Sequence, residues 1–299
     1  MAEFSYDDRN GFIWLNGEMT PWRDAKLHVL SHGLHYASAV FEGERAYGGV
    51  VYKLAEHTKR LIEGARDLDF EIPYSADQLN EATQQVVAAN KLSDCYIRPI
   101  AWRGSEMMGV SAQKTSINVA IAAWDWGAYF PMEKRLEGIR VDWAKKYRRP
   151  DPMTAPAKTK ATGLYMIGTI EKHRAEKDGY SEALMLDWRG RVAECTSGNI
   201  FFVKGDELHS PTPDCFLDGI TRRVIIQLAE KRGYTCIDRV IMPEELSDFE
   251  ECFMVGTAAE VTPIREIGTH TFKPGKVTEN LLLDYMAEVK PDKVVAAAE

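Results

Sequence analysis

Two lysines near the middle of the chain, Lys158 and Lys160, carry the side chains best suited to covalent chemistry. They lie in a short run of Ala, Thr and Gly at 157–163, directly after Pro156. The breakers on either side predict a loop or strand end that leads into a helix. With so little bulk around it, a lysine amine there could reach a carbonyl carbon and form a Schiff base. Taken alone, the stretch favours the alternative of two exposed lysines in a polar loop.

Composition excludes several classes of function. The chain has 299 residues, 45% hydrophobic and 27% charged, which is typical of a globular protein long enough for two domains. Its net charge of −8 argues against nucleic-acid binding. No apolar run approaches the roughly 20 residues of a membrane span. We see no zinc motif, P-loop or dinucleotide fingerprint, and expect no metal.

The cysteines indicate the compartment. They are odd in number and form no Cys-x-x-Cys pair, and the N-terminus has no secretory signal. We therefore expect free thiols in a reducing cytoplasm. The cysteines are Cys95, Cys195, Cys215, Cys236 and Cys252.

Hydrophobic periodicity and turn signals predict an α+β organisation. Asn16-Gly17 and Gly48-Gly49 are hairpin signals, and Ser75 is the expected cap of a helix that runs to about Asn90. Further helices are expected at 56–68, 162–177, 219–232 and about 279–289. Strands are expected at 95–102, 117–123, 139–143, 182–187, 192–196, 199–203, 236–241 and 251–255. The aromatic stretch after 123 has no clean period, so we divide the chain into an N-terminal domain, 1–123, a linker, 124–135, and a C-terminal domain, 136–299.

A series of motifs in one order resembles the fold-type IV pyridoxal-phosphate transaminases, and among them the branched-chain amino acid aminotransferases. The central motif is Lys-Ala-x-Gly-x-Tyr at 160–165, with Glu194 lying 34 residues after the lysine. The others lie at 31–36, 40–43, 96–99, 126–129, 192–201, 217–222 and 256–260. The resemblance implies a small N-terminal α/β domain and a larger C-terminal domain with a β-barrel-like core and helices. It also implies pyridoxal 5'-phosphate (PLP) as cofactor.

The resemblance assigns roles around this cofactor. Lys160, rather than Lys158, would form the Schiff base and shuttle the α-proton. Glu194 would keep the pyridine nitrogen protonated, so that the ring accepts electrons. The phosphate would be bound by Arg60 and by the N–H groups at the start of a helix and in a small turn, with Tyr165 against the cofactor. The implied cofactor-binding residues are Arg60, Lys160, Tyr165, Glu194, Gly219, Ile220, Thr221, Gly256 and Thr257.

The resemblance also implies a substrate pocket. Aromatic walls would take a branched aliphatic side chain, and Arg98 would pair with the distal carboxylate of glutamate or 2-oxoglutarate. The implied substrate-binding residues are Tyr36, Phe41, Gly43, Tyr96, Arg98, Trp126, Tyr129, Thr257 and Ala258. The implied reaction is ping-pong transamination of Leu, Ile or Val with 2-oxoglutarate. A homodimer is implied too, because 106–110 resembles a loop that reaches a neighbouring subunit's pocket.

The sequence departs from the family pattern on the substrate side. Glu44 stands where an apolar residue is usual, Met107 replaces a glycine, and Thr162 and Leu164 replace smaller or polar neighbours. These departures bear on the preferred substrate more than on the cofactor.

Each residue singled out also has an ordinary interpretation: a solvent-facing strand glutamate for Glu194, an exposed helix charge for Arg60, a cap for Thr221, a turn former for Thr257 and a core aromatic for Tyr165. Three relatives of the same fold remain as alternatives: a D-amino acid transaminase, an (R)-amine transaminase and an aminodeoxychorismate lyase. Ile100, two residues beyond Arg98, argues against the Arg-x-His carboxylate trap of D-specific relatives. From other classes, a cofactor-free Schiff-base aldolase and a non-catalytic binding protein remain.

Overall fold

The structure, a computed structural model, describes residues 5–126, 135 and 137–290. It forms two compact units: Met1–Gly127 with Thr159–Gly163, and Ala128–Lys158 with Leu164–Glu299. This division differs from the sequence-based one, because the segment that carries Lys160 belongs to the first unit. The predicted linker at 124–135 lies mostly outside the described residues.

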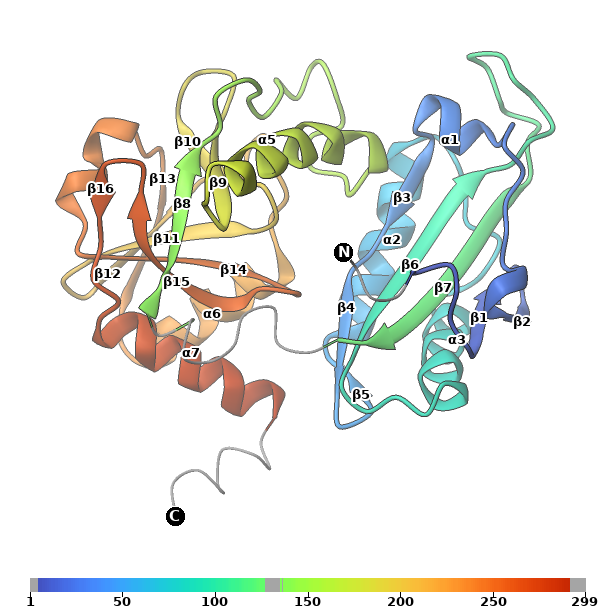
Figure 1. Cartoon of the computed structure of the whole chain (residues 1–299), viewed down its shortest axis with the longest axis horizontal. Coiled ribbons are helices and arrows are strands. Elements are labelled where there is room, and N and C mark those ends of the chain that lie inside the picture. Colours follow the sequence, from blue (N-terminus) through green and yellow to red (C-terminus); the bar gives the residue numbers. More distant parts are fainter. Residues whose placement is uncertain (1–4, 127–134, 136, 291–299) are drawn as a thin grey trace. The chain divides into compact units, whose positions relative to one another are not determined.

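The first unit is built on a seven-stranded sheet in the order β2-β1-β7-β6-β4-β5, with β3 also paired to β6 (Figure 1). Every one of its pairs is antiparallel. The Asn16-Gly17 turn has the two positive φ angles, 50° and 100°, that this hairpin signal predicts. The strands are β1 Phe12–Leu15, β2 Glu18–Pro21, β3 Ala39–Phe41, β4 Glu44–Tyr47, β5 Val50–Val51, β6 Cys95–Arg103 and β7 Ile117–Asp125.

Two helices, α2 (Leu54–Asp67) and α3 (Ala76–Ala89), pack with this sheet around an apolar core. The predicted Ser75 cap of α3 is confirmed, and it forms a capping box: Gln78 N donates to Ser75 Oγ at 3.2 Å, and Ser75 N donates to Gln78 Oε1 at 2.9 Å. Successive strand residues face opposite sides of a sheet. Ile97 on β6 therefore faces the helices, and Tyr96 and Arg98 face away from them. The unit also contains η1 Trp22–Asp24 and α1 His32–Tyr36.

The second unit is built on a nine-stranded sheet in the order β10-β9-β8-β15-β14-β11-β12-β13, with β16 paired to β15. Pairs β8–β9, β8–β15 and β12–β13 are parallel, and the rest are antiparallel. In Figure 1, β8 runs steeply across β14, so the sheet is curled. Its strands are β8 Ile139–Trp143, β9 Glu182–Leu186, β10 Val192–Cys195, β11 Asn199–Lys204, β12 Glu207–Pro211, β13 Thr235–Arg239, β14 Glu251–Gly256, β15 Glu260–Ile267 and β16 His270–Thr271.

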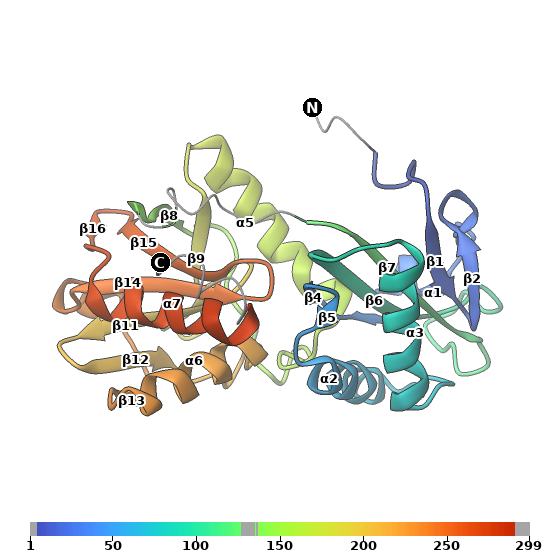
Figure 2. The same cartoon turned by 90° about the horizontal axis from the view of Figure 1, so that it is seen from below.

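Helices α6 (Ile220–Lys231) and α7 (Lys276–Val289) lie together beside β14 in the second unit (Figure 2). Helix α5 (Tyr165–Lys177) follows the 3-10 turn η2 (Thr162–Leu164) and packs against β8 and β9. A further turn, η3, spans Pro243–Asp248. The mixed α/β class predicted from sequence is confirmed. Among the described residues, no helix has both the length and the apolar character needed to cross a membrane.

Candidate active site

Lys160 lies on a short segment that pairs with the first unit's sheet. Phe41 N donates to the Lys160 carbonyl at 3.2 Å, and Val40 forms an isolated bridge with Ala161. The Lys160 side chain is half-buried, with Nζ 4.9 Å from the centre of the Phe41 ring. Lys158 is exposed. Of the two lysines, Lys160 is therefore the one whose amine stands in a packed, aromatic environment.

Arg98 lies on the same face of the sheet as Phe41. Its guanidinium carbon is 4.6 Å from the Phe41 ring centre and 5.2 Å from that of Tyr96. Its Nη2 donates to the Tyr96 hydroxyl at 3.1 Å. A cation held between two rings, with one N–H already directed by a hydroxyl, suits recognition of a carboxylate.

Gly43 and Trp126 complete this cluster around Tyr96. A Cβ at Gly43 would come within 2.1 Å of the Tyr96 hydroxyl, so the close approach requires glycine. Trp126 stacks at a tilt on Tyr96, with ring centres 5.3 Å apart. Tyr129, the remaining predicted pocket aromatic, lies outside the described residues.

Tyr36 is placed apart from these contacts, at the end of α1. Its side chain is 46% exposed, stacks on His32 and donates to the Met108 carbonyl at 3.2 Å. It thus joins α1 to the segment 106–110.

Arg60 forms a bidentate ion pair. Its Nε and Nη2 donate to the two carboxylate oxygens of Glu42, at 2.6 and 2.8 Å. His57, one turn earlier on α2, contacts the same carboxylate through Nδ1 at 2.7 Å. Glu42 is fully buried, which opposes ionisation, but these two partners bring the pKa of its carboxyl well below its usual range.

Glu194 is buried on β10 and is held by a cation and an amide. Arg149 Nε lies 2.9 Å from its carboxylate, and Asn199 Nδ2 donates to it at 3.2 Å. The solvent-facing alternative for Glu194 is therefore wrong, because the side chain is only 8% exposed. A carboxylate can accept several hydrogen bonds, so these partners leave room for one more from a cationic ring nitrogen.

Asn199 connects this carboxylate to the start of α6. Its Nδ2 also donates to the Leu217 carbonyl at 2.9 Å, and its Oδ1 accepts from Gly219 N at 3.2 Å. Gly219 is the N-cap residue of α6 and supplies no side-chain cap, and the first turn has no acidic residue. The N–H groups of Ile220 and Thr221 thus begin a helix whose first turn suits an anion.

The turn after β14 lies beside the start of β11, because Asn199 pairs with Val255. Gly256 is close to the Ser197 carbonyl: a Cβ built there would be 3.4 Å from it. Thr257 and Ala258 follow and are half-buried. Tyr165, also half-buried, is the first residue of α5.

Comparisons with known proteins agree with this geometry. Residues 39–267 match the family model described as "Amino-transferase class IV". The chain is 40% identical over 302 aligned positions to the branched-chain-amino-acid aminotransferase of Pseudomonas aeruginosa, covering 99% of this chain and 98% of that protein. This chain belongs to the class IV aminotransferases.

Other proteins similar to this aminotransferase chain are also named as branched-chain aminotransferases. It is 40% identical over 262 positions to the branched-chain-amino-acid aminotransferase of Escherichia coli strain K12, with 86% of this chain and 84% of that one covered. The solved enzyme of Thermoproteus uzoniensis with norvaline has a TM-score of 0.90 at 35% identity, covering 96% and 98%. The crystal structure of the Thermobaculum terrenum branched-chain amino acid aminotransferase in its PLP form has a TM-score of 0.85 at 28% identity. The match covers 94% of this chain and 95% of that one.

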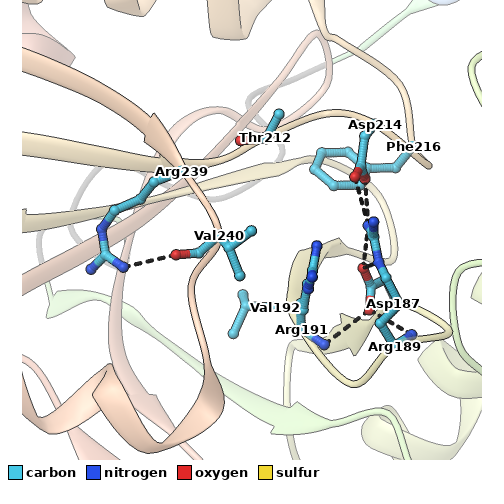
Figure 3. Close-up of a pocket in the computed structure, with 9 residues that line it drawn as sticks. All are labelled: Asp187, Arg189, Arg191, Val192, Thr212, Asp214, Phe216, Arg239 and Val240. Atoms are coloured by element: carbon cyan, nitrogen blue, oxygen red, sulfur yellow. Dashed lines mark hydrogen bonds and ion pairs between the residues drawn. The ribbon is translucent and has the colours of Figure 1, made fainter.

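The second unit of this aminotransferase chain has a polar pocket between the β9–β10 turn, Thr212 and Arg239 (Figure 3). Asp187, Asp214 and Cys215 bring their side-chain ligand atoms within 4.8 Å of one another there. Arg189 donates to both carboxylates, and burial raises the pKa of the Cys215 thiol to about 12. The Arg189 guanidinium is therefore already paired with the two carboxylates that a metal ion would need as ligands.

Sequence reasoning missed the partners that hold the predicted residues. Glu42 lies inside the motif at 40–43 but was assigned no role, and His57 and Arg149 carried no signal of their own. Asn199 had a signal, since it ends the polar turn 196–199 directly after Glu194. Its contact with Gly219 needed the tertiary structure.

Proposed function

We propose that the chain catalyses PLP-dependent transamination of L-branched-chain amino acids with 2-oxoglutarate. The products would be branched 2-oxo acids and L-glutamate, in a ping-pong cycle. The observation that carries the proposal is the match, along nearly the whole chain, to proteins named branched-chain-amino-acid aminotransferase. The cluster of Phe41, Tyr96 and Arg98 supports it, since apolar rings beside one guanidinium suit both an aliphatic and an acidic side chain.

The residues present fit PLP as cofactor. The start of α6, with glycine as its N-cap, and the Gly256–Thr257 turn offer N–H and hydroxyl donors for a phosphate. Glu194 offers a buried carboxylate for the ring nitrogen. The role of Arg60 in phosphate binding stays a prediction. When bound, PLP supplies an electron sink that makes the substrate's α-proton removable.

The chain's own residues would then do the following. The Nζ of Lys160 would anchor the cofactor and, once released, take up and return the α-proton. Glu194 would keep a proton on the ring nitrogen. Tyr96 and the backbone N–H groups of Thr257 and Ala258 would bind the α-carboxylate, and Arg98 the distal carboxylate. Tyr36 and Tyr129 are proposed as further pocket residues.

Substrate choice is tested with two amino donors. The purified protein with PLP is incubated with 2-oxoglutarate and either L-leucine or D-alanine, and glutamate is measured. We expect glutamate from L-leucine. Formation only from the D-substrate would favour a D-amino acid transaminase instead.

The choice of lysine is tested by paired substitutions. Lys160→Ala should abolish both turnover and the near-visible absorbance of the bound cofactor, whereas Lys158→Ala should keep both because its side chain is exposed. The reverse result would show that the other lysine carries the chemistry. If neither protein nor wild type takes up PLP, the cofactor assignment is wrong.

We also propose a homodimer in the cytoplasm. Exposed apolar side chains gather on two segments of the first unit, 27–36 and 106–110, which the Tyr36–Met108 hydrogen bond joins. Sedimentation should give twice the 33.7 kDa of one chain. Val110→Asp, at an 86% exposed position, should shift this mass toward the monomer. The free thiols support a reducing compartment.

A further inference from the structure

A charged cluster is buried between the sheet and α2 of the first unit. Glu42 and Glu44 are each at most 1% exposed, and His57 is 2% exposed. Of these four residues, Arg60 is the one that reaches solvent, with 18% of its side chain exposed. Burying charged groups costs free energy, and buried ion pairs rarely add net stability. Stabilisation of the fold therefore does not explain why this cluster is present, and we look for a functional role.

The cluster's geometry fixes the orientation of one guanidinium. The ionised Glu42 carboxylate can only accept hydrogen bonds, so His57 Nδ1 must carry the proton of that contact. Arg60 gives its Nε and Nη2 to the same carboxylate. This bidentate contact sets both the position and the plane of the guanidinium, and directs its remaining N–H donors away from Glu42.

The support for Glu42 is itself rigid. Glu42 N donates to the Pro99 carbonyl of β6 at 2.8 Å, which ties its backbone to the sheet. Its neighbours Phe41 and Gly43 contact Arg98 and Tyr96 on the other face. His57 and Arg60 are three residues apart on α2, so they share one face of that helix. A strand and a helix thus meet at this single carboxylate.

We propose that Glu42, held by His57, is a positioning residue that fixes the Arg60 guanidinium for contact with the phosphate of the cofactor. This inference rests on the proposed function, because it takes Arg60 as a phosphate ligand. Glu42 and His57 do not themselves touch the phosphate. They act by removing the rotational freedom of Arg60 before the anion arrives, which lowers the entropic cost of binding.

The test compares two ligands that differ only in the phosphate. Dissociation constants of pyridoxal 5'-phosphate and pyridoxal are measured by absorbance on the cofactor-depleted full chain. The ratio of the dissociation constant of pyridoxal to that of pyridoxal 5'-phosphate isolates the phosphate's contribution to affinity. In Glu42→Gln, which keeps the shape but loses the charge, we expect this ratio to fall at least about tenfold, with the affinity for pyridoxal unchanged.

A second pair of variants keeps the test decisive if Glu42→Gln does not fold. His57→Leu removes the donor to Glu42 but leaves the ion pair, and should lower the ratio about threefold or more. His57→Asn places an amide donor near the Nδ1 position and should restore it. An unchanged ratio in His57→Leu and in any folded Glu42→Gln protein would overturn the inference.

Controls separate the inference from the proposed function. Glu266→Gln breaks a comparable bidentate pair, with Arg140 in the second unit, and should leave the ratio at the wild-type value. Arg60→Gln should lower the ratio at least as much as Glu42→Gln. If Arg60→Gln leaves it unchanged, the phosphate role of Arg60 is wrong, and the inference fails with it. If Arg60→Gln lowers it and Glu42→Gln does not, only the positioning role is wrong.

Discussion

Glu42 and Glu44 are two carboxyl groups, two positions apart, that are both buried but have pKa values shifted in opposite directions. Glu42 has Arg60 and His57 as partners and is ionised. Burial, and then the charge of Glu42, raise the pKa of Glu44 well above its usual range. Its Oε2 has no hydrogen-bond partner among the described residues. Glu44 therefore keeps its proton to a higher pH in the folded protein than in an unfolded chain.

This difference makes stability depend on pH. A carboxyl with a raised folded pKa contributes stability below its unfolded pKa of about 4.3, and loses it as pH rises toward the folded value. Glu44→Gln cannot ionise, so its free energy of unfolding relative to wild type should increase with pH by up to about 1.4 kcal/mol per pH unit. Urea unfolding at pH 5, 6, 7 and 8 measures this slope.

The slope is the readout for Glu44, because a constant offset only reports how well glutamine packs. Glu63→Gln, an exposed carboxyl on α2, is the control and should show no such trend. A difference between Glu44→Gln and wild type that stays constant over this range would contradict the raised pKa of Glu44.

At the scale of elements, the first turn of α6 is positioned by a strand rather than by its own cap. Gly219 presents no side chain there, and the carboxamide of Asn199 on β11 fills the space. A Cβ at Gly219 would come within 2.3 Å of Asn199 Oδ1. Its φ of −66° is ordinary, so close approach, and not backbone conformation, is the reason for glycine.

Gly219→Ala should therefore displace Asn199, and with it the hydrogen bond to Glu194. We expect PLP affinity to fall about tenfold or more, with the fold retained, because a helix still forms with alanine at this position. Titration of the cofactor-depleted protein, followed by absorbance, measures this. Gly205→Asn, in the turn after β11, is the control, because a side chain there would meet nothing within 4 Å and asparagine tolerates the φ of 58°. Equal affinities in the two variants would show that Asn199 can adjust.

At the scale of the whole molecule, burial in the two cores determines how accessible and how reactive the cysteine thiols are. Cys195 and Cys252 lie in the core of the second unit and Cys95 in that of the first. Burial raises the pKa of Cys95 and Cys236 to about 11, and those of Cys195 and Cys252 well above their usual range. The thiolate is the reactive form, so the folded protein should resist alkylation and oxidation.

A thiol titration checks this expectation. With a disulfide reagent at pH 8, the folded protein should react slowly, beginning at the half-buried Cys236. In urea, all five cysteines should become accessible and react. Cys236→Ser should remove the first phase alone. Rapid reaction of several cysteines in the folded protein would mean that a core opens on the timescale of the experiment.

Much of the fold was predictable because its signals are local. The Asn16-Gly17 turn, the helix cap at Ser75 and the strand at 139–143 depend on residues a few positions apart, and all three are confirmed. The last helix begins at Lys276, three residues before the predicted Glu279, and its buried apolar face begins at Val277. Strand β3 was missed because it has only three residues, 39–41. Strand β15 was missed because it contains Pro263, which argues against a strand.

The chain by itself determined its family, through motifs whose order and spacing survive without any structure, and the side-chain types available at Lys160, Glu194 and Arg98. Only the tertiary structure decided which groups hold them: Glu42 on Arg60, Asn199 between Glu194 and Gly219, and the return of Thr159–Gly163 to the first unit. These contacts join residues that lie on different elements. Their formation depends on strand pairing and packing, which a local pattern does not encode.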